Sequence, residues 1–257
     1  MVQEVIAESA FTTEGQPDGT SIIIVDPYTG CELKCPYCFQ WNDSDWGKKI
    51  LVNLNIPELL SRQIDEIRGA GVYIGSKCDP YMPLEQKYHL TRQCLGILAK
   101  HNSHVYITTK SDNQLILKDL NLLKSFQAPV TVLMGLSNIS QADKGRANIN
   151  IQVANELNKQ GIDVWCFITP ILPYVMNIDE MIDELDDGIP VYFDKLRVMT
   201  QGNQDKKILG WIRSKYPQYF DEYTRILFQG DTAYYRELYT KYSRNPRCRF
   251  MTDEWGA

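Results

Sequence analysis

The stretch "CELKCPYC" (residues 31–38) places three cysteines within eight positions, spaced as Cys31-x3-Cys35-x2-Cys38. Thiols this close together are typical of zinc sites and iron–sulfur clusters. A structural zinc site needs four ligands, usually from two paired motifs, and the chain contains no second CxxC. A closed zinc site would therefore require Cys78 to fold back onto the motif, whereas a [4Fe-4S] cluster held by three cysteines leaves one iron open.

The chain around this motif alternates short β-like runs with amphipathic segments. Six runs are rich in Val, Ile and Tyr and short enough to be buried parallel strands. They cover residues 21–25, 72–76, 104–108, 130–136, 163–168 and 191–198. Helical patterns follow at residues 56–68, 84–100, 115–126, 149–160 and 178–185.

Two of the helical segments carry recognisable end signals. Asn55 and Glu58 have the spacing of a capping box, and Pro57 lies between them in the first turn. Gly161 follows the segment at residues 149–160 and suits the left-handed position at a helix C-terminus. We therefore expect helices to begin near residue 56 and to end near residue 160.

Six β/α repeats predict an α/β protein with a parallel sheet and right-handed crossovers. Because a closed TIM barrel needs eight repeats, we expect a partial (β/α)6 TIM-like barrel, although a flat doubly wound sheet fits the same periodicity. We divide the single domain into an N-terminal extension at residues 1–20, a barrel core at 21–202, and a helical, aromatic-rich C-terminal cap at 203–257. The aromatic side chains of this cap either pack in the core or stack on a planar substrate.

Composition limits the classes of partner. The chain has 257 residues, 44% of them apolar, and a formal net charge of −5, which argues against an extended nucleic-acid surface. We find no signal peptide and no apolar run long enough to span a bilayer, so we expect a soluble cytoplasmic protein without a membrane partner. In that compartment the seven cysteines are expected to be thiols or metal ligands.

Several residues outside the motif have expected places. Cys94 and Cys166 fall in apolar helix and strand patterns and are expected in the core. Cys248 is expected in a basic loop, and the stretch at residues 12–19 also has a loop-like composition. Trp41 and Trp46 flank a polar stretch, and they cover the metal site, contact a substrate, or anchor this stretch from the surface to the core.

The spacing Cx3CxΦC, with aromatic Tyr37 before the last cysteine, resembles the signature of the radical S-adenosylmethionine (SAM) superfamily. The motif also follows the first predicted strand and precedes the first long helix, as it does in that superfamily. This resemblance implies that Cys31, Cys35 and Cys38 hold a [4Fe-4S] cluster whose open iron binds SAM. It further implies cleavage of SAM to a 5′-deoxyadenosyl radical that abstracts hydrogen, and an external electron donor of the flavodoxin or ferredoxin type.

A closer resemblance to the spore photoproduct lyase branch covers about residues 26–198. It rests on "DPYTGCELKCPYCF" (26–39), "GSKCDPYMPLEQKYHLTRQCLGIL" (75–98), "ITTKSDNQLILKDLNLL" (107–123) and "ITPILP" (168–173). These motifs follow successive predicted strands, at the end of a barrel where active sites form. The resemblance implies a SAM pocket lined by Tyr37, Ser76, Cys78, Asp79, Lys110 and Ser137. Lys110 suits the SAM carboxylate, and Arg146 is either a second partner of that carboxylate or a solvated loop residue.

Two departures from that branch bear on the substrate. The position that matches the hydrogen-donor cysteine of the lyase is Ser76, and Phe39 stands where the lyase looks to have a tyrosine. Cys78 can replace the donor as a catalytic residue if it shares a strand face with Ser76. We therefore expect a radical SAM enzyme acting on a small molecule or a peptide. The alternatives are a nucleic-acid lesion lyase or nucleobase-modifying enzyme, and a non-catalytic metal-binding protein.

Overall fold

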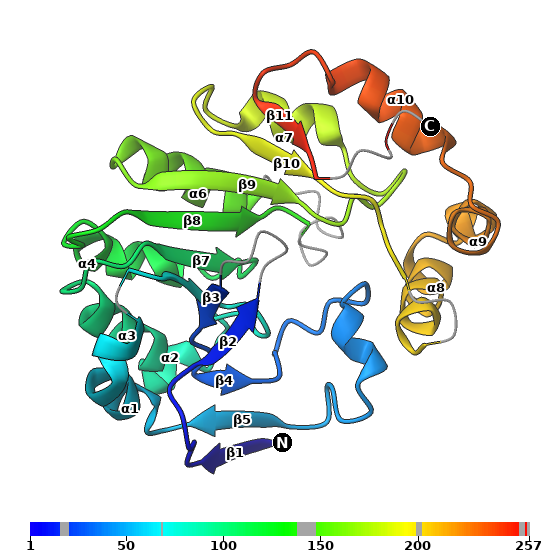
Figure 1. Cartoon of the computed structure of the whole chain (residues 1–257). Helices are drawn as coiled ribbons and strands as arrows, with labels where there is room; N and C mark the ends of the chain where they lie inside the picture. The colour runs from blue at the N-terminus through cyan, green and yellow to red at the C-terminus, as the bar shows by residue number, and fades with distance from the viewer. Residues whose placement is uncertain (16–20, 68, 138–147, 199–201, 252–254, 256–257) are drawn as a thin grey trace.

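The computed structural model describes residues 1–15, 21–67, 69–137, 148–198, 202–251 and 255. Its main feature is an eight-stranded sheet in the order β11-β10-β9-β8-β7-β6-β3-β2 (Figure 1). The strands are β2 (Thr12–Gly15), β3 (Ser21–Ile24), β6 (Gly71–Ile74), β7 (Val105–Thr109), β8 (Val130–Gly135), β9 (Asp163–Ile168), β10 (Val191–Phe193) and β11 (Cys248–Phe250). All neighbours from β3 to β11 pair in parallel, and β2 joins the edge antiparallel to β3. The protein is therefore a mixed α/β structure with a parallel sheet.

The order of the strands separates two expectations. From β3 to β11 the strands lie side by side in the order in which they occur in the chain. A doubly wound sheet reverses its strand order at an internal switch point, so that alternative is wrong. All six predicted runs form strands, but the last is shorter than expected, because β10 ends at Phe193 and residues 194–198 are irregular.

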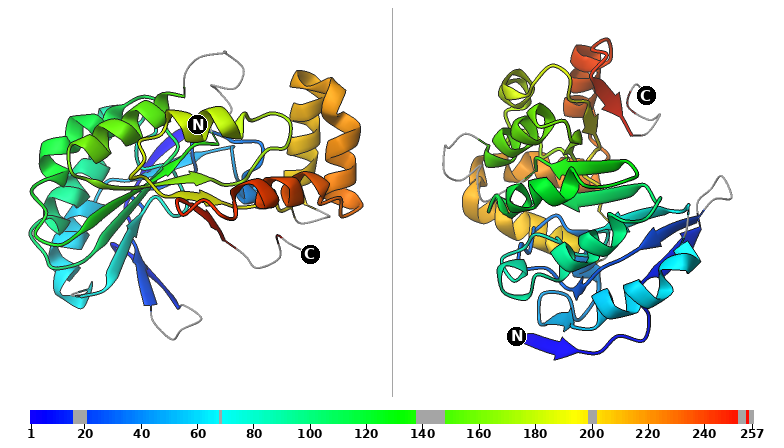
Figure 2. Two further views of the ribbon diagram at one scale, coloured as in Figure 1. Left: turned by 90° about the horizontal axis from the view of Figure 1, so that it is seen from above. Right: turned by 90° about the vertical axis from the view of Figure 1, so that its left-hand side faces the viewer.

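Helices cover one face of the sheet. They are α1 (Ile56–Gln63), α2 (Glu85–Tyr88), α3 (Leu90–Leu98), α4 (Leu120–Leu123), α6 (Ile149–Lys159) and α7 (Ile178–Glu184), with 3-10 turns η2 (Ile64–Ile67) and η3 (Leu115–Asp119). Figures 1 and 2 show α1, α3, α4 and α6 gathered on the same side. Gly161 takes the expected left-handed conformation just after α6, with φ 83°.

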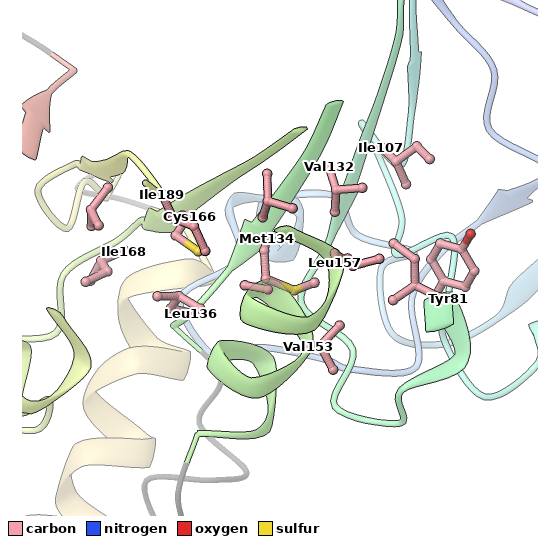
Figure 3. Packing of buried hydrophobic residues seen from close by; sticks show 14 of the residues in the cluster. Tyr81, Ile107, Val132, Met134, Leu136, Val153, Leu157, Cys166, Ile168 and Ile189 are labelled. Carbon is pink, nitrogen blue, oxygen red and sulfur yellow. The ribbon is translucent and has the colours of Figure 1, made fainter. Parts of the chain in front are cut away.

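The core lies between this helical layer and alternate residues of the strands. In Figure 3, Val153 and Leu157 of α6 face Val132 and Met134 of β8, and Cys166 of β9 lies alongside. Leu157 has no solvent-exposed surface, and full burial of such a side chain contributes about 1.5–3 kcal/mol to stability. Cys94 and Cys166 are both buried in this core, as the sequence predicted.

The opposite face of the sheet carries a row of half-buried aromatic rings. Tyr73 stacks on Tyr106 with ring centroids 4.7 Å apart, and Tyr106 meets Trp165 edge-on at 6.4 Å. Tyr192 then stacks on both Trp165 (5.5 Å) and Phe167 (4.7 Å). These five residues alternate along β6, β7, β9 and β10 with the buried residues that face the helices, as period-two side chains must.

A second, three-stranded sheet brackets the three-cysteine segment. It has the order β1-β5-β4, with β1 (Val2–Val5), β4 (Tyr28–Thr29) and β5 (Ile50–Asn53). β4 ends just before the cysteines and β5 begins after them, and the two strands pair antiparallel, with Tyr28 opposite Val52. The cysteine segment is therefore a long loop whose two ends are hydrogen-bonded together. It contains one 3-10 turn, η1 (Phe39–Asn42).

Three local predictions in the first half of the chain were wrong. Residues 12–15 of the loop-like stretch form β2. The helix expected at residues 84–100 is two helices, because His89 between them is left-handed with φ 53°. The capping box does not form, since the Asn55 side chain accepts from the Ala7 N–H (2.8 Å) and donates to the Ala7 carbonyl (2.9 Å).

The C-terminal region is mostly helical, as predicted, with α8 (Gln204–Lys215), α9 (Phe220–Phe228) and α10 (Ala233–Tyr242) around the short turn η4 (Pro217–Tyr219). The prediction missed β11, which joins the main sheet beside β10. Cys248 is therefore the buried first residue of a strand, and its placement in a loop was wrong. Within the described ranges, no helix is long and apolar enough to cross a bilayer.

Candidate functional site

A cavity of about 390 Å³ lies where several strands of the main sheet end. Residues at or just after the ends of β6, β7, β9 and β10 line one part of it, and the cysteine loop and Gln204 line the rest. In Figure 1 this loop, between β4 and β5, lies on the side toward which the arrowheads of β8 and β9 point, and its turn η1 contacts α8. Ligand-binding cavities of about 300–1,000 Å³ at the carboxyl ends of parallel strands are common in α/β proteins.

All three motif cysteines line this cavity as half-buried free thiols. Burial raises the pKa of each, and that of Cys31 reaches about 12, whereas the nearby Lys110 ammonium acts in the opposite direction on Cys35 and Cys38. Within the described part of the chain, no three His, Cys, Asp or Glu side chains are already arranged as a metal-ligand set. The donor chemistry nevertheless fits an iron–sulfur cluster, because soft thiols from one loop share one wall of one cavity.

Tyr37 fixes the cysteine loop to the sheet. Its ring is buried, and its hydroxyl donates to the backbone carbonyl of Ser137 beyond β8. The Lys110 ammonium lies 5.1 Å from the centre of the Tyr37 ring, within the range of a cation–π contact. Trp41 anchors the same loop by donating from Nε1 to the Cys35 carbonyl (2.8 Å), whereas Trp46 lines the cavity.

Lys110 reaches the cavity from the end of β7. Its Nζ donates to the Thr169 carbonyl at 2.8 Å. Its aliphatic stem lies against Gly135, the last residue of β8, so closely that a Cβ on this glycine would overlap the stem. The Lys110 backbone N–H donates to Asp79 Oδ2 at 2.6 Å, which ties the end of β7 to the loop after β6.

The loop after β6 is held by two carboxylates. Asp79 lines the cavity, but its Oδ1 accepts from Tyr81 N (3.0 Å) and Thr109 Oγ1 (2.8 Å), and burial raises its pKa. Asp26 accepts from the N–H groups of Gly75 and Lys77, each at 2.9 Å. Sequence reasoning missed Asp26, although it begins the first resemblance motif.

The geometry of that loop also depends on Gly75, which has φ 91° and no room for a Cβ beside the Thr108 carbonyl and Pro80. Ser76 is exposed in the cavity, and Cys78 is buried beside it against Tyr28 and Val52. Ser76 and Cys78 both lie beyond the end of β6, so the alternation of side chains along a strand does not place them on a common face.

Ser137, which was also expected at the site, is not among the described residues that line the cavity. Ser137 is buried, and its hydroxyl donates to the Pro170 carbonyl at 2.9 Å. Arg146 lies outside the described residues. In the C-terminal region Tyr223, Tyr235 and Tyr242 are buried in the core, and no described aromatic residue of this region lines the cavity.

Sequence reasoning missed one wall of the cavity, formed by Asp194, Lys195, Arg197 and Gln204. The Gln204 amide donates to the carbonyls of Tyr37 (2.7 Å) and Arg197 (3.0 Å). In return, Asn42 Oδ1 accepts from the N–H groups of Asn203 (3.0 Å) and Gln204 (3.3 Å) at the start of α8. We call these contacts the Asn42–Gln204 clamp. No local sequence motif indicates that they form.

No protein-family model matches the chain. An uncharacterized protein of Methanocaldococcus jannaschii, MJ0683, is 27% identical over 210 residues, which are 77% of this chain and 78% of that protein. An uncharacterized protein of Mycobacterium tuberculosis, Rv2578c, is 24% identical over 245 residues, covering 83% of this chain and 70% of the other. Because both relatives are uncharacterized, they indicate no activity for this chain.

Solved structures of spore photoproduct lyase have the same fold. The lyase complexed with dinucleoside spore photoproduct aligns with a TM-score of 0.61 at 12% identity over 84% of this chain. A double mutant of the lyase with bound AdoMet and dinucleoside spore photoproduct aligns with a TM-score of 0.55 at 13% identity. This chain spans 66% of the length of those lyase chains. At 12% and 13% identity, the likeness shows a shared fold and no more.

Proposed function

We propose that this protein is a radical SAM enzyme on a partial (β/α)6 barrel. The observation that carries the proposal is that Cys31, Cys35 and Cys38 line one cavity together with Lys110, on a fold shared with spore photoproduct lyase, a radical SAM enzyme. When bound, a reduced [4Fe-4S] cluster and SAM supply hydrogen-atom abstraction by the 5′-deoxyadenosyl radical. An external flavodoxin- or ferredoxin-type protein is the proposed electron source.

The residues of this chain have separate tasks in the proposal. The three cysteines would hold the cluster, and Lys110 would pair with the SAM carboxylate, because its ammonium is already held at the cavity by the Thr169 carbonyl. Tyr37 and the Asn42–Gln204 clamp fix the backbone that carries the cysteines. Ser76, Cys78 and Asp79 shape the side of the cavity beyond β6. Cys78, as a free thiol, remains the proposed candidate for a hydrogen-atom donor.

The test is anaerobic reconstitution with iron and sulfide, followed by dithionite and SAM. We expect 5′-deoxyadenosine from the wild-type protein and from Cys248→Ala, whose thiol lies outside the cavity lining. Cys31→Ala and Cys38→Ala should give none, and should also lose the visible absorption of the cluster. A fully reconstituted wild-type protein that forms no 5′-deoxyadenosine would contradict the proposal, and about one tightly bound zinc per chain without iron would support a non-catalytic metal-binding protein.

We propose a small molecule or a peptide as substrate. The main rival is a nucleic-acid lesion or nucleobase, since the structurally similar lyase has been solved with dinucleoside spore photoproduct. Binding experiments with DNA and RNA at several salt concentrations separate the two, because nucleic-acid binding weakens steeply as salt rises. Tight, salt-dependent binding of either polymer would favour the rival.

A further inference from the structure

Helix α8 has a charge balance opposite to that of the whole chain. The chain has a formal net charge of −5, whereas α8 carries four exposed cationic side chains and one carboxyl group, which is buried. These are Lys206, Lys207, Arg213, Lys215 and Asp205. We call Lys206, Lys207 and Arg213 the α8 basic face, and leave out Lys215 because it has another interaction partner.

The contacts of the α8 basic face leave its charge at the surface. Lys207 Nζ lies 4.2 Å from the centre of the Trp41 ring, and the Arg213 guanidinium carbon lies 4.4 Å from that of Phe220. Contacts of this kind orient a cation without supplying an opposite charge. No ion pair between described residues joins these three side chains to a carboxylate.

The α8 basic face borders the cysteine loop. Helix α8 contacts η1, which begins directly after Cys38 (Figure 1). Trp41 of η1 contacts Lys207 through its ring and donates from Nε1 to the Cys35 carbonyl at 2.8 Å. Trp41 therefore connects the α8 basic face to the backbone of a proposed cluster ligand.

The segment between η1 and β5 does not offset this positive charge. Its charged residues are Asp43, Asp45, Lys48 and Lys49, and all four are exposed. Lys48 pairs with Asp45 at 3.4 Å. Two carboxylates and two ammonium groups balance one another, so the positive charge of α8 persists beside the cysteine loop.

An exposed glycine lies within the same helix. Gly210 is four residues after Lys206 and three before Arg213, which places it on their side of α8. A Cβ at this position would meet no atom within 4 Å, so packing inside the chain does not require glycine there. Glycine inside a helix is less favourable than alanine. Its presence among the cations leaves the helix backbone open to close approach by another protein.

We propose that an acidic one-electron carrier protein docks on the α8 basic face beside Trp41. This inference rests on the proposed function, because it names the docking place of the electron donor that the proposed cluster requires. Opposite charges speed and orient such encounters. Complexes that exchange electrons are small, below about 1,200 Å² of buried surface, so one helix face and its neighbouring turn can suffice.

The proposed transfer involves one electron only. The reduced carrier is oxidised by one electron, the proposed cluster is reduced by the same electron, and no bond forms or breaks. Nucleic acid is the other polyanion that a basic face can bind, but three cations on a chain of net charge −5 favour an acidic protein. The connection through Trp41 to Cys35 also has a use only for an electron carrier.

The test is calorimetric titration of an oxidised flavodoxin and of an oxidised [2Fe-2S] ferredoxin, each with a negative net charge, into the full-length, anaerobically reconstituted protein. At least one carrier should bind, and more weakly at high salt, because ions screen such contacts. Lys206→Glu/Lys207→Glu should raise the Kd on the order of tenfold. Lys100→Glu/Lys159→Glu makes the same change in net charge on exposed residues away from α8 and should leave the Kd largely unchanged.

Reduction of the cluster, followed by stopped-flow absorption, is a second readout. The reduced carrier should bleach the cluster more slowly in Lys206→Glu/Lys207→Glu than in the wild type, whereas dithionite, which needs no docking, should bleach both at similar rates. Gly210→Gln adds a side chain without a charge and should also weaken carrier binding. Lys206→Gln/Arg213→Gln, which keeps Lys207 on Trp41, replaces the first variant if that variant does not fold.

Three results would overturn the inference at the level of binding. They are that neither carrier binds, that the α8 variants bind as the wild type does, or that Lys100→Glu/Lys159→Glu loses as much affinity, since net charge alone would then account for binding. Salt-dependent binding of DNA or RNA that is lost in the α8 variants would assign the face to nucleic acid and overturn it as well.

Failure of the proposed function is seen separately. Formation of 5′-deoxyadenosine with dithionite needs no carrier, whereas carrier binding needs no SAM. A protein that cleaves SAM with dithionite but binds neither carrier keeps the proposed function and loses this inference. A protein that binds a carrier through α8 but never cleaves SAM does the reverse.

Discussion

Lys110 is held at four points, which makes it a sharp test of the site at the scale of single residues. Its N–H donates to Asp79, and its carbonyl accepts from the Asn150 amide at 3.0 Å. Its ammonium donates to the Thr169 carbonyl, and its stem lies against Gly135. The direction of the ammonium therefore depends on Gly135, because only a residue without a Cβ leaves room for the Lys110 stem.

Gly135→Ala should displace the Lys110 side chain, because the new methyl group would occupy the space of its stem. Overpacking of this kind costs about 1–3 kcal/mol, and the resulting shift of the ammonium should raise the Kd for SAM on the order of tenfold. Equilibrium binding of SAM to the reconstituted protein measures this.

The matched control is Gly96→Ala in α3, where a Cβ meets no atom within 4 Å. It should leave the Kd for SAM unchanged. Equal SAM affinity for Gly135→Ala and the wild type would mean that the Lys110 position does not matter for SAM.

Residues near the motifs were predictable, and residues brought in by long-range folding were not. Cys31 and Lys110 follow predicted strands, so their place at the strand ends could be expected from the sequence. Gln204 lies in a stretch without a motif, and its amide joins the Tyr37 carbonyl of the cysteine loop to the Arg197 carbonyl beyond β10 only because α8 lies against that loop. A local sequence pattern has no means of encoding such a contact.

At the scale of elements, the break between α2 and α3 has a physical cause in Glu85. Its carboxylate accepts from the N–H groups of Thr91 (3.1 Å) and Arg92 (3.0 Å), in the first turn of α3. The left-handed His89 turns the chain so that a residue of α2 can satisfy the N-terminal donors of the next helix. The apolar periodicity continues through the break and therefore predicted a single helix.

Glu85 should make stability depend on pH. Burial raises its pKa above the ordinary 4.5, and the nearby Asp119 carboxyl adds to the rise, against hydrogen bonds from Tyr28, Arg92 and Thr91. A raised pKa means that the folded state holds this proton more tightly than the unfolded state. This contribution to stability is complete below pH 4.5 and is lost as the pH rises through the raised pKa.

Urea unfolding of the apoprotein from pH 4 upward measures the effect. Over that window the free energy of unfolding should fall more steeply for the wild type than for Glu85→Gln, which does not titrate there. The difference in slope is the readout, because the loss of a hydrogen bond shifts the variant equally at every pH. If the free energy of unfolding changed with pH equally in the wild type and in Glu85→Gln, the assignment of this pH dependence to Glu85 would be contradicted.

The contact of α6 with the sheet gives a second prediction at this scale. Leu157 is fully buried among the strand residues shown in Figure 3. Leu157→Ala should lower the free energy of unfolding by about 2–5 kcal/mol, through lost burial and the cavity left behind. Gln152→Ala, exposed on the same helix, should change it by less than about 0.5 kcal/mol. Denaturant unfolding compares the two, and similar losses would contradict this packing.

Strands with long apolar runs were predictable from the sequence, and short or exposed strands were not. β8 is buried along its whole length, so its run of apolar residues stands out in the sequence. β1 and β2 are almost wholly exposed, and β11 has three residues, so their side chains carry no comparable signal. These strands form because a neighbouring backbone offers hydrogen bonds, which depends on the finished sheet.

At the scale of the whole molecule, the Asn42–Gln204 clamp joins segments more than 160 residues apart. Gln204→Ala removes two hydrogen bonds, each worth about 0.5–1.5 kcal/mol, and frees the Tyr37 and Arg197 carbonyls. We expect the protein to fold but to retain less iron per chain after reconstitution and desalting, with weaker visible absorption.

Gln152→Ala, which lies outside the cavity, is the control for iron content. Iron content equal to that of the wild type in Gln204→Ala would show that the cysteine loop holds its shape without α8. If Gln204→Ala lost stability but not iron, the clamp would stabilise the fold without supporting cluster binding.

The clamp also has a consequence for the order of events during protein synthesis. The three cysteines leave the ribosome before Gln204, which follows 167 residues after Tyr37. At about 5–20 residues per second this leaves the thiols without their clamp for roughly ten to thirty seconds. During that interval a nascent chain can lose its thiols to zinc or to oxidation. Delivery of iron for the proposed cluster should therefore succeed best after translation has ended.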